Sequence, residues 1–318
     1  MRAFVTGGAG FIGSNLADRL LEKGYEVIVY DDFSTGQMQF VEHNLGNSKY
    51  TLVEADVLDK AFLNNAMRDS DIVFHFQANA DVKGGINNTT IDMEQNIIGT
   101  HNVLEAMKIN EIKQIAFASS ATVYGEPEQI PTPETISPVQ TSLYGASKYS
   151  AEAFIQAYCE YFDMKSWIFR FVSFMGTRYT HGVIFDFLKK LKHNPSELYI
   201  LGDGTQRKSY LHVNDGIDAI LLAIERSKEK TNIFNLGNKE WINVKDLADI
   251  VCTAAGFEKV HYTFGGGIRG WKGDSPFVHL DISRISSLGW NPKYSVKETI
   301  IDTVQYLLKN EDLLYTRK

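Results

Sequence analysis

The chain has 318 residues, 32 Lys plus Arg, 39 Asp plus Glu and a formal net charge of −7. A mildly acidic chain without runs of like charge does not fit a protein that binds the phosphate backbone of nucleic acids. Hydrophobic residues make up 44% of the chain, typical of a folded globular protein. The first residues lack the apolar core of a signal peptide, and no stretch approaches the ~20 apolar residues of a spanning helix. We therefore expect a cytoplasmic protein with no membrane partner.

The first half of the chain alternates short apolar runs with amphipathic stretches. Apolar runs predict strands over residues 3–6, 26–30, 50–53, 71–76 and 114–118. Helical periodicity predicts helices over 11–23, closed by Gly24, and over 91–109. Alternating strands and helices are typical of an α/β fold, here a Rossmann-type doubly wound parallel sheet.

A proline-rich segment over 126–139 interrupts this alternation and predicts an ordered surface loop. A helix over 144–162 and a strand over 167–171 follow, and the rhythm changes after about residue 175. Beyond that point we expect helices over 183–192, 214–226, 244–255 and 295–309 and a strand over 233–236. We predict a first domain over 1–175, to which 213–238 returns, and a smaller C-terminal α/β lobe over 176–318. The two cysteines, Cys159 and Cys252, lie too far apart and too far from other ligands to predict a metal site or a disulfide.

A glycine-rich turn directly follows the first predicted strand and opens the first helix. Gly7, Gly10 and Gly13 stand at G-x-x-G-x-x-G spacing within residues 6–13. The first glycine permits the tight turn, the second lets backbone N–H groups approach a pyrophosphate, and the third lets the helix pack closely on the strand. The positive end of the helix, at Phe11 and Ile12, then faces the phosphates. The turn therefore predicts a dinucleotide cofactor.

Acidic residues end the second predicted strand, about 20 residues beyond the glycines. A carboxylate at Asp31 can bind both ribose hydroxyls of the adenosine half and would repel a 2′-phosphate, so we expect NAD rather than NADP. Asp32 is equally consistent with a solvated turn residue. Ser34 in the same turn is a further candidate cofactor contact.

A Tyr-x-x-x-Lys pair, Tyr144 and Lys148, begins the helix predicted after the proline-rich loop. At i, i+4 spacing the ammonium can lie near the phenol, lower its pKa and make Tyr144 a usable general base. Taken alone such a pair is an ordinary surface feature, but downstream of a dinucleotide fingerprint it predicts a catalytic pair. Ser120 follows the fifth strand, where parallel sheets place their ligands, and its hydroxyl is our candidate for relaying a proton to Tyr144. Thr122 is the second candidate, and the alternative for both is a capping or turn hydroxyl.

These motifs together resemble the extended short-chain dehydrogenases, which include the nucleotide-sugar epimerases and dehydratases. The resemblance rests on TGGAGFIG at 6–13, SSATVYG at 119–125, YGASK at 144–148 and GDGTQRKSYLHV at 202–213, and it covers essentially the whole chain. The N-x-x-G-T helix at 96–100, the HGVI segment at 181–184 and the LGWNP segment at 288–292 are similar as well. Within the family the UDP-glucose 4-epimerases are the most similar.

The resemblance implies a mechanism and a set of contacts. Tyr144, with Ser120, would remove the proton of the sugar 4-hydroxyl, and the hydride of carbon 4 would pass to NAD and return to the other face of a 4-keto sugar. Lys148 would hold the nicotinamide ribose and tune Tyr144. The second lobe would bind the nucleotide sugar, and a homodimer is common in the family. Further cofactor contacts implied are Asp56, Val57, Phe76, Gln77, Ala78, Asn96 and Ser119, and the implied substrate contacts beyond Ser120 and Tyr144 are Ser173, Val183, Arg207, Arg269 and Asp274.

Three features bear on which reaction is expected. The 4,6-dehydratases of the family carry an Asp-Glu pair in the stretch that reads Ala121-Thr122-Val123 here, which disfavours dehydratase chemistry. Ser173 stands where the family usually has Asn, and Gln77 where a small residue is usual. These departures keep open a 4-dehydrogenase or dehydratase that acts on another nucleotide sugar. A non-catalytic NAD-binding regulator is a third reading, although such relatives usually lose the tyrosine or lysine.

Overall fold

A seven-stranded sheet organises the larger of two compact units in the computed structural model, which describes residues 1–316. The strand order is β11-β6-β5-β4-β1-β2-β3, and the pairs from β3 through β6 are all parallel. The order reverses between β1 and β4, and folds of this kind place their ligands at the carboxyl ends of the strands beside such a reversal. The strands are β1 (Arg2–Thr6), β2 (Glu26–Asp31), β3 (Tyr50–Glu54), β4 (Ile72–His75), β5 (Gln114–Ser120), β6 (Lys165–Phe171) and β11 (Thr231–Leu236).

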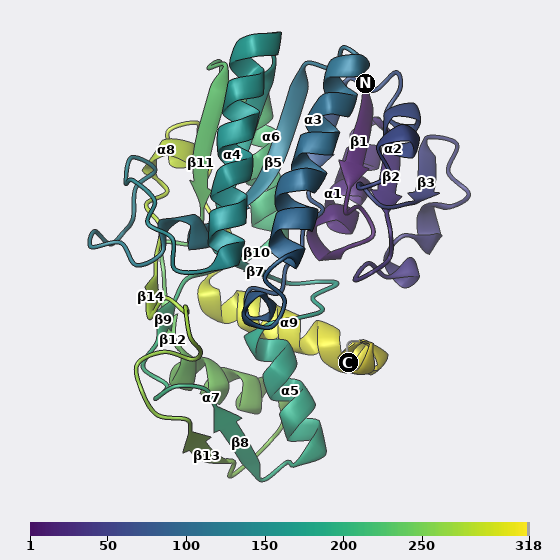
Figure 1. The fold of residues 1–318 in the computed structure, drawn as a ribbon. Helices are drawn as coiled ribbons and strands as arrows, with labels where there is room; N and C mark the ends of the chain where they lie inside the picture. The colour runs from purple at the N-terminus through teal and green to yellow at the C-terminus, as the bar shows by residue number, and fades with distance from the viewer. Residues whose placement is uncertain (317–318) are drawn as a thin grey trace. The chain divides into compact units, whose positions relative to one another are not determined.

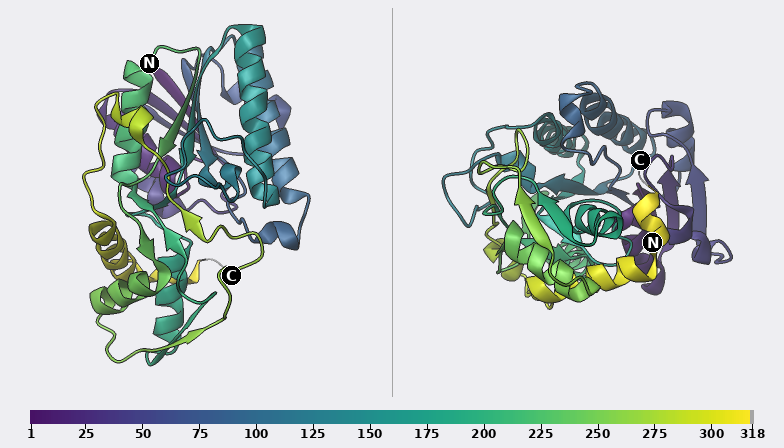
Figure 2. Two further views of the ribbon diagram at one scale, coloured as in Figure 1. Left: turned by 90° about the vertical axis from the view of Figure 1, so that its left-hand side faces the viewer. Right: turned by 90° about the horizontal axis from the view of Figure 1, so that it is seen from below.

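Helices cover both faces of this sheet, as the edge-on view shows (Figure 2, left). Helices α3 (Gly99–Ile109) and α4 (Leu143–Phe162) lie side by side on one face (Figure 1). Helices α1 (Phe11–Glu22) and α6 (Val213–Arg226) share the other face, where Arg19 pairs with Asp218 at 2.5 Å. The strands are buried on both faces, which explains their continuous apolar runs and confirms the Rossmann-type α/β fold.

The remaining elements of this unit are short. Helix α2 (Lys60–Ala66) was not predicted, because its seven residues carry too little periodicity. The predicted helix over 91–109 contains a π-helical segment, η4 (Met93–Ile98), before α3. Single π turns of this kind are frequent at functional sites. The other short turns are η1 (Met38–Phe40), η2 (Glu42–Asn44), η3 (Gly84–Ile86) and η5 (Ala121–Tyr124).

The second unit comprises Glu126–Ile136, Val172–Gly216 and Asn235–Lys318, so it includes part of the proline-rich loop. Its strands form small sheets, which pair β10 with β7, β13 with β8, and β9 with both β12 and β14. The sequence did not predict most of these strands, because two to four residues are too few to show alternation. Its helices are α5 (Val183–His193), α7 (Val244–Ala255), α8 (Ser283–Ser286) and α9 (Val296–Lys309), with η6 (Glu311–Tyr315), and its strands are β7 (Ser173–Met175), β8 (Glu197–Ile200), β9 (Arg207–Lys208), β10 (Tyr210–His212), β12 (Ile242–Asn243), β13 (His261–Phe264) and β14 (Phe277–Val278).

The two cysteines, Cys159 and Cys252, are both free and buried. Among the described residues, none of the helices is both long and apolar enough to cross a membrane.

The core between the sheet and α3 and α4 is apolar, but α4 also buries Lys148 and Glu152. Burying ionisable groups is costly, and Lys148 lies on the helix that also carries Tyr144, so this buried lysine points to a function.

Candidate active site

The glycine-rich turn connects β1 to α1 at the reversal point of the sheet. Gly7 has φ +67°, and a Cβ atom there would lie 2.7 Å from the backbone nitrogen of Gln77. A Cβ at Gly13 would lie 2.1 Å from the carbonyl oxygen of Gly7, so both positions require glycine. Gly10 is the N-cap of α1 and, within the described chain, no side chain caps that helix. The uncapped N-terminus fits a pyrophosphate at this turn.

Asp31, at the end of β2, is anchored by hydrogen bonds, one of which comes from the glycine-rich turn. Its buried carboxylate accepts hydrogen bonds from the backbone N–H groups of Ala9 and Phe33, both at 2.9 Å. Desolvation raises the pKa of Asp31, and these two bonds partly offset that effect. Asp32 is exposed and accepts from the backbone and hydroxyl of Ser34, which is the behaviour of a turn residue. Asp31 is therefore the better placed of the two acidic residues for a ribose.

His75, a buried histidine at the end of β4, forms a hydrogen bond with Thr6 at the end of β1, just before the glycine-rich turn. Thr6 Oγ1 lies 2.7 Å from His75 Nδ1, and His75 Nε2 lies 2.9 Å from Thr100 Oγ1. Burial lowers the pKa of His75 to about 3, so the ring is neutral. Thr6 Oγ1 also accepts from the backbone N–H groups of Phe76 and Gln77, which fixes the chain just beyond β4. The side chain of Gln77 donates to Gln95 at 2.6 Å, so its unusual bulk is directed toward η4.

Asn96 occupies the π-helical segment and joins three parts of the chain. Its side-chain oxygen accepts from the backbone of Asn79, and its amide nitrogen donates to Asp92 and to Ser147 Oγ on α4. Ser147 in turn donates to the carbonyl oxygen of Tyr144. Asp92 was not predicted, because an isolated acidic residue ahead of a helix has no distinguishing spacing. Its carboxylate is buried, desolvation raises its pKa, and its charge acts on both Tyr144 and Lys148.

Tyr144 and Ser120 meet because α4 approaches the turn η5 very closely. A Cβ atom at Gly145 would lie 2.6 Å from the carbonyl oxygen of Thr122, so only glycine allows this approach. Ser120 Oγ accepts from the backbone and the hydroxyl of Thr122 at 3.2 and 3.0 Å. Ser120 also lies close enough to Tyr144 to lower the pKa of the tyrosine. Thr122 therefore contacts Ser120, and Ser120 lies beside Tyr144.

Lys148 lies one helical turn beyond Tyr144 and is buried. Its ammonium donates to the carbonyl oxygen of Ala118 at 2.7 Å and lies 4.7 Å from the centre of the Phe117 ring. Desolvation lowers the pKa of Lys148 to about 7, although the charges of Glu152 and Asp92 raise it. Burial raises the pKa of Tyr144 to about 12. The predicted lowering of the Tyr144 pKa is therefore wrong for the protein alone, because desolvation outweighs the lowering effect of Ser120.

The other predicted cofactor residues lie along the same carboxyl edge of the sheet. Asp56 follows β3 and caps a turn by accepting from the backbone of Leu58, while Val57 is buried against Gly99. The hydroxyl of Ser119 donates to Glu152 at 2.5 Å, which leaves its backbone for any cofactor contact. Phe76 and Ala78 are partly buried beyond β4.

The predicted substrate residues of the second unit form one cluster and several separate positions. Arg269 donates to the carbonyl oxygen of Asp274 at 2.8 Å and pairs with Glu126. Asp274 also accepts from Lys208 at 2.7 Å. Lys208 was not predicted, because the two-residue strand β9 is too short to show alternation. Arg207, the predicted ligand, lies over the rings of Phe277 and Trp241, at 4.1 and 5.3 Å. Ser173 is exposed at the start of β7, and Val183 begins α5.

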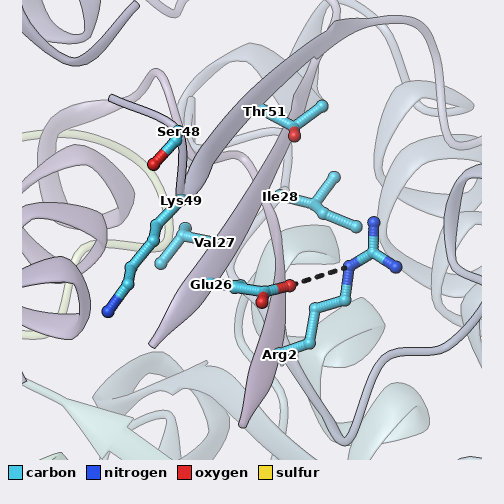
Figure 3. A pocket seen from close by; sticks show the side chains of 7 residues that line it. All are labelled: Arg2, Glu26, Val27, Ile28, Ser48, Lys49 and Thr51. Carbon is cyan, nitrogen blue, oxygen red and sulfur yellow. Dashed lines mark ion pairs between the residues drawn. The ribbon is translucent and has the colours of Figure 1, made fainter. Parts of the chain in front are cut away.

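A shallow pocket lies at the other end of the sheet, among the amino ends of β1, β2 and β3 (Figure 3). The side chains of Arg2 and Glu26 face each other there at 4.0 Å, and Lys49 points outward. Both partners of the ion pair are more than a third exposed. Exposed pairs of this kind contribute little, and the pocket offers no set of converging groups for chemistry.

Known proteins have sequences and structures similar to those of this chain. The model of the NAD dependent epimerase/dehydratase family matches residues 3–237. A putative UDP-glucose 4-epimerase of Methanocaldococcus jannaschii is 35% identical over 96% of this chain and 98% of its own length. A UDP-N-acetyl-alpha-D-glucosaminuronate decarboxylase of Bacillus cytotoxicus is 27% identical over 98% of this chain and 99% of its own length.

Solved structures agree with the sequence relatives. The UDP-glucose 4-epimerase of Thermotoga maritima, solved with UDP-glucose, is 31% identical with a TM-score of 0.89 and covers 98% of this chain and all of its own. The UDP-glucose 4-epimerase of Thermus thermophilus, solved with NAD, is 31% identical with a TM-score of 0.86 over 97% of this chain and 99% of its own. Together with the glycine-rich turn, the acidic end of β2 and the Tyr144–Lys148 helix, these matches show that the chain belongs to the NAD dependent epimerase/dehydratase family, whose cofactor is NAD.

Proposed function

We propose that this protein is an NAD-dependent 4-epimerase of a nucleotide-linked hexose, of the UDP-glucose/UDP-galactose type. The observation that carries the proposal is the proximity of Thr122, Ser120 and Tyr144, in which Thr122 donates to Ser120 and Ser120 lowers the pKa of Tyr144, with Lys148 one helical turn away. These groups can move a proton to and from a sugar hydroxyl at the edge of the sheet where NAD is expected.

The proposed mechanism assigns each residue a separate task. The hydroxyl of Ser120 accepts the proton of the sugar 4-hydroxyl and donates its own to Tyr144. Bound NAD would supply a hydride acceptor beside carbon 4 and a positively charged ring near Tyr144. That positive charge matters, because a pKa of about 12 keeps Tyr144 protonated at neutral pH in the protein alone. After the 4-keto sugar turns over, Tyr144 returns the proton to the oxygen.

The nucleotide half of the substrate is the proposed source of binding energy. Arg269 and Lys208 present two cations around Asp274 in the second unit and suit a pyrophosphate. Binding energy from this distant part of the substrate allows the sugar itself to be held loosely enough to turn over. Ser173, Val183 and Arg207 remain candidate contacts.

The stretch Ala121-Thr122-Val123 favours epimerisation over dehydration. Elimination of water across carbons 5 and 6 needs a further acid and base beside the sugar, and η5 carries no carboxylate. A second candidate follows from the decarboxylase relative, which shares nearly the full length of the chain. A 4-keto intermediate also activates a carboxylate at carbon 5 for loss, so a UDP-uronic acid is an alternative substrate.

The test is a proton NMR time course of the purified protein with UDP-galactose, UDP-N-acetylgalactosamine and UDP-glucuronic acid, without added cofactor. Conversion of a galacto to a gluco sugar supports the proposal and indicates retained NAD. A pentose product from UDP-glucuronic acid would instead indicate a decarboxylase, an accumulating 4-keto sugar a dehydratase, and free NADH a dehydrogenase. Inertness toward all of them would favour a non-catalytic NAD-binding protein.

We further propose a homodimer formed through α3 and α4. The observations that support it are exposed apolar side chains on the outer surface of this helix pair, including Ile109, Leu143 and Phe154 at 62, 45 and 42% exposure. Light scattering after size exclusion, on the protein and on Phe154→Glu, tests this: a mass that halves in the variant supports the interface.

A further inference from the structure

A buried ion pair joins α4, the helix that carries Tyr144 and Lys148, to the neighbouring strand β6. Glu152 on α4 and Arg170 on β6 are 0% and 3% exposed. The guanidinium binds both carboxylate oxygens, Nε to Oε1 at 3.1 Å and the terminal nitrogen to Oε2 at 2.7 Å. Replacing such buried pairs with apolar side chains is often neutral or stabilising, so stability alone does not explain this pair.

The pair is connected to both ends of the turn that carries Ser120. At one end, Ser119 Oγ donates to Glu152 at 2.5 Å. At the other end, Arg170 donates to Tyr124 Oη at 2.8 Å, and its guanidinium carbon lies 4.8 Å from the centre of the Tyr124 ring. Ser119 and Arg170 are register partners on β5 and β6, so the contact spans adjacent strands. The segment from Ser119 through η5 to Tyr124 is therefore held at its first and last residues by a single ion pair.

The helix that supplies Glu152 is the helix that supplies Tyr144 and Lys148. On this helix Gly145 contacts the turn η5 at Thr122, and Glu152 holds both ends of the segment from Ser119 to Tyr124, directly at Ser119 and through Arg170 at Tyr124. Ser120 thus has a fixed position relative to α4, whereas a hydroxyl on an unsupported turn would move by more than a hydrogen bond tolerates.

We propose that the Glu152–Arg170 pair is a positioning device for catalysis, which holds Ser120 against Tyr144 and provides a fixed negative charge beside Lys148. This inference rests on the proposed function, in which these three residues act on the substrate. Glu152 and Arg170 do not themselves touch the reacting atoms.

The two halves of the proposal have separate tests. Tyr124→Phe removes only the hydroxyl that accepts from Arg170, and Arg170→Lys keeps the charge but loses the two-pronged contact. Both variants should lower kcat about 3- to 10-fold with KM changed less than twofold, because the proton path is misaligned while substrate binding is kept. Neither should shift the pH profile, because no charge is lost. The matched control is Glu160→Gln, an exposed residue on the same helix, which should match the wild type.

Glu152→Gln tests the charge. The titratable and charged groups around Lys148 are Glu152 and Tyr144 on α4, Asp92 ahead of η4, and His75 on β4, which is neutral. Arg170 on β6 adds a cation, which pairs with the Glu152 carboxylate at 2.7 Å. Removal of the Glu152 charge lowers the pKa of Lys148, so the alkaline limb of kcat should move to lower pH by about one unit. A carbon-13 NMR titration of the lysine side chains, with Lys148→Met to assign the signal, reads the same change without substrate.

These readouts separate failure of the inference from failure of the proposed function. Unchanged kcat in both Tyr124→Phe and Arg170→Lys would overturn the positioning role, and an unmoved Lys148 titration in Glu152→Gln would overturn the role of the charge. If Glu152→Gln does not fold, a doubly neutral Glu152→Gln/Arg170→Gln protein gives the titration. If the wild type turns over none of the nucleotide sugars, the proposed function fails, and the titration still decides whether Glu152 controls the charge of Lys148.

Discussion

The two ends of the seven-stranded sheet are built from the same strands, but ionisable groups are buried at one end and exposed at the other. At the carboxyl ends, Asp31, His75, Asp92, Tyr144 and Lys148 are wholly or partly buried and have pKa values that desolvation moves from their usual range. At the amino ends, Arg2 pairs with Glu26 and Asp69 at 4.0 Å through largely exposed side chains. Burying ionisable groups is costly, and a cluster of such groups with shifted pKa values is typical of a functional site. The comparison therefore favours the carboxyl end of the sheet as the candidate active site.

The largest expected effect is at Tyr144. Tyr144→Phe removes the group that exchanges a proton with the sugar oxygen, so kcat should fall about 1,000-fold while bound NAD is retained. Turnover is measured by NMR, and NAD by absorbance after denaturation. Tyr161→Phe is the matched control on the same helix, since Tyr161 is 80% exposed. A Tyr144→Phe enzyme with more than a tenth of wild-type activity would remove Tyr144 from the mechanism.

The next effect concerns cofactor binding at the same edge. Asp31→Asn removes the charge expected to hold the adenosine ribose, and NAD affinity should fall about 10- to 100-fold, consistent with the loss of charge-assisted hydrogen bonds. Discrimination against NADP should weaken as well. Isothermal titration measures both, with Asp32→Asn as the control that changes NAD affinity less. Equal losses in the two variants would mean that Asp31 has no special position.

Burial of Lys148 predicts an unusual dependence of stability on pH. Its pKa is about 7 in the folded protein and about 10.4 when unfolded. Between these values the unfolded chain binds more protons, so this residue makes folding more favourable as the pH rises from 7 toward 10. Urea unfolding of wild type and Lys148→Met at pH 6, 8 and 10 should show the variant losing its relative advantage across that range. Parallel curves would mean that Lys148 is not desolvated.

The smallest effect is expected at the amino edge. Glu26→Gln should change the free energy of unfolding by less than about 0.5 kcal/mol and leave kcat unchanged, because an exposed ion pair is screened by solvent. Urea unfolding and the NMR assay provide the two values. A loss of activity here would remove the contrast between the two ends of the sheet.

The sequence predicted the larger unit better than the smaller one, for a physical reason. Strands buried on both faces and a glycine turn with fixed steric demands leave strong local signals, so β1 to β6 and the turn at Gly7 were predicted within a few residues. In the second unit, two-residue strands such as β9 leave none, and Lys208 was missed while its neighbour Arg207 was chosen. Asp92 and Glu152 were missed as well, because their significance lies in burial and in partners distant along the chain.

The pKa of Tyr144 shows a further limit of sequence reasoning. The i, i+4 spacing to Lys148 is visible in the sequence, but the balance between a nearby cation and desolvation depends on burial. In the protein alone desolvation prevails. The spacing thus identifies the pair, and only the structure shows which of its two groups is charged.

We propose that groups at the carboxyl edge of the sheet, with bound NAD, remove a hydride from carbon 4 of the sugar and return it to the same carbon. The most direct measurement is conversion of UDP-galactose carrying deuterium at carbon 4, followed by mass spectrometry and NMR of the product. We predict UDP-glucose that keeps the deuterium at carbon 4, because the label moves to bound NAD and back without contact with water. Loss of the label to solvent, or no conversion by protein that contains NAD, would contradict the account.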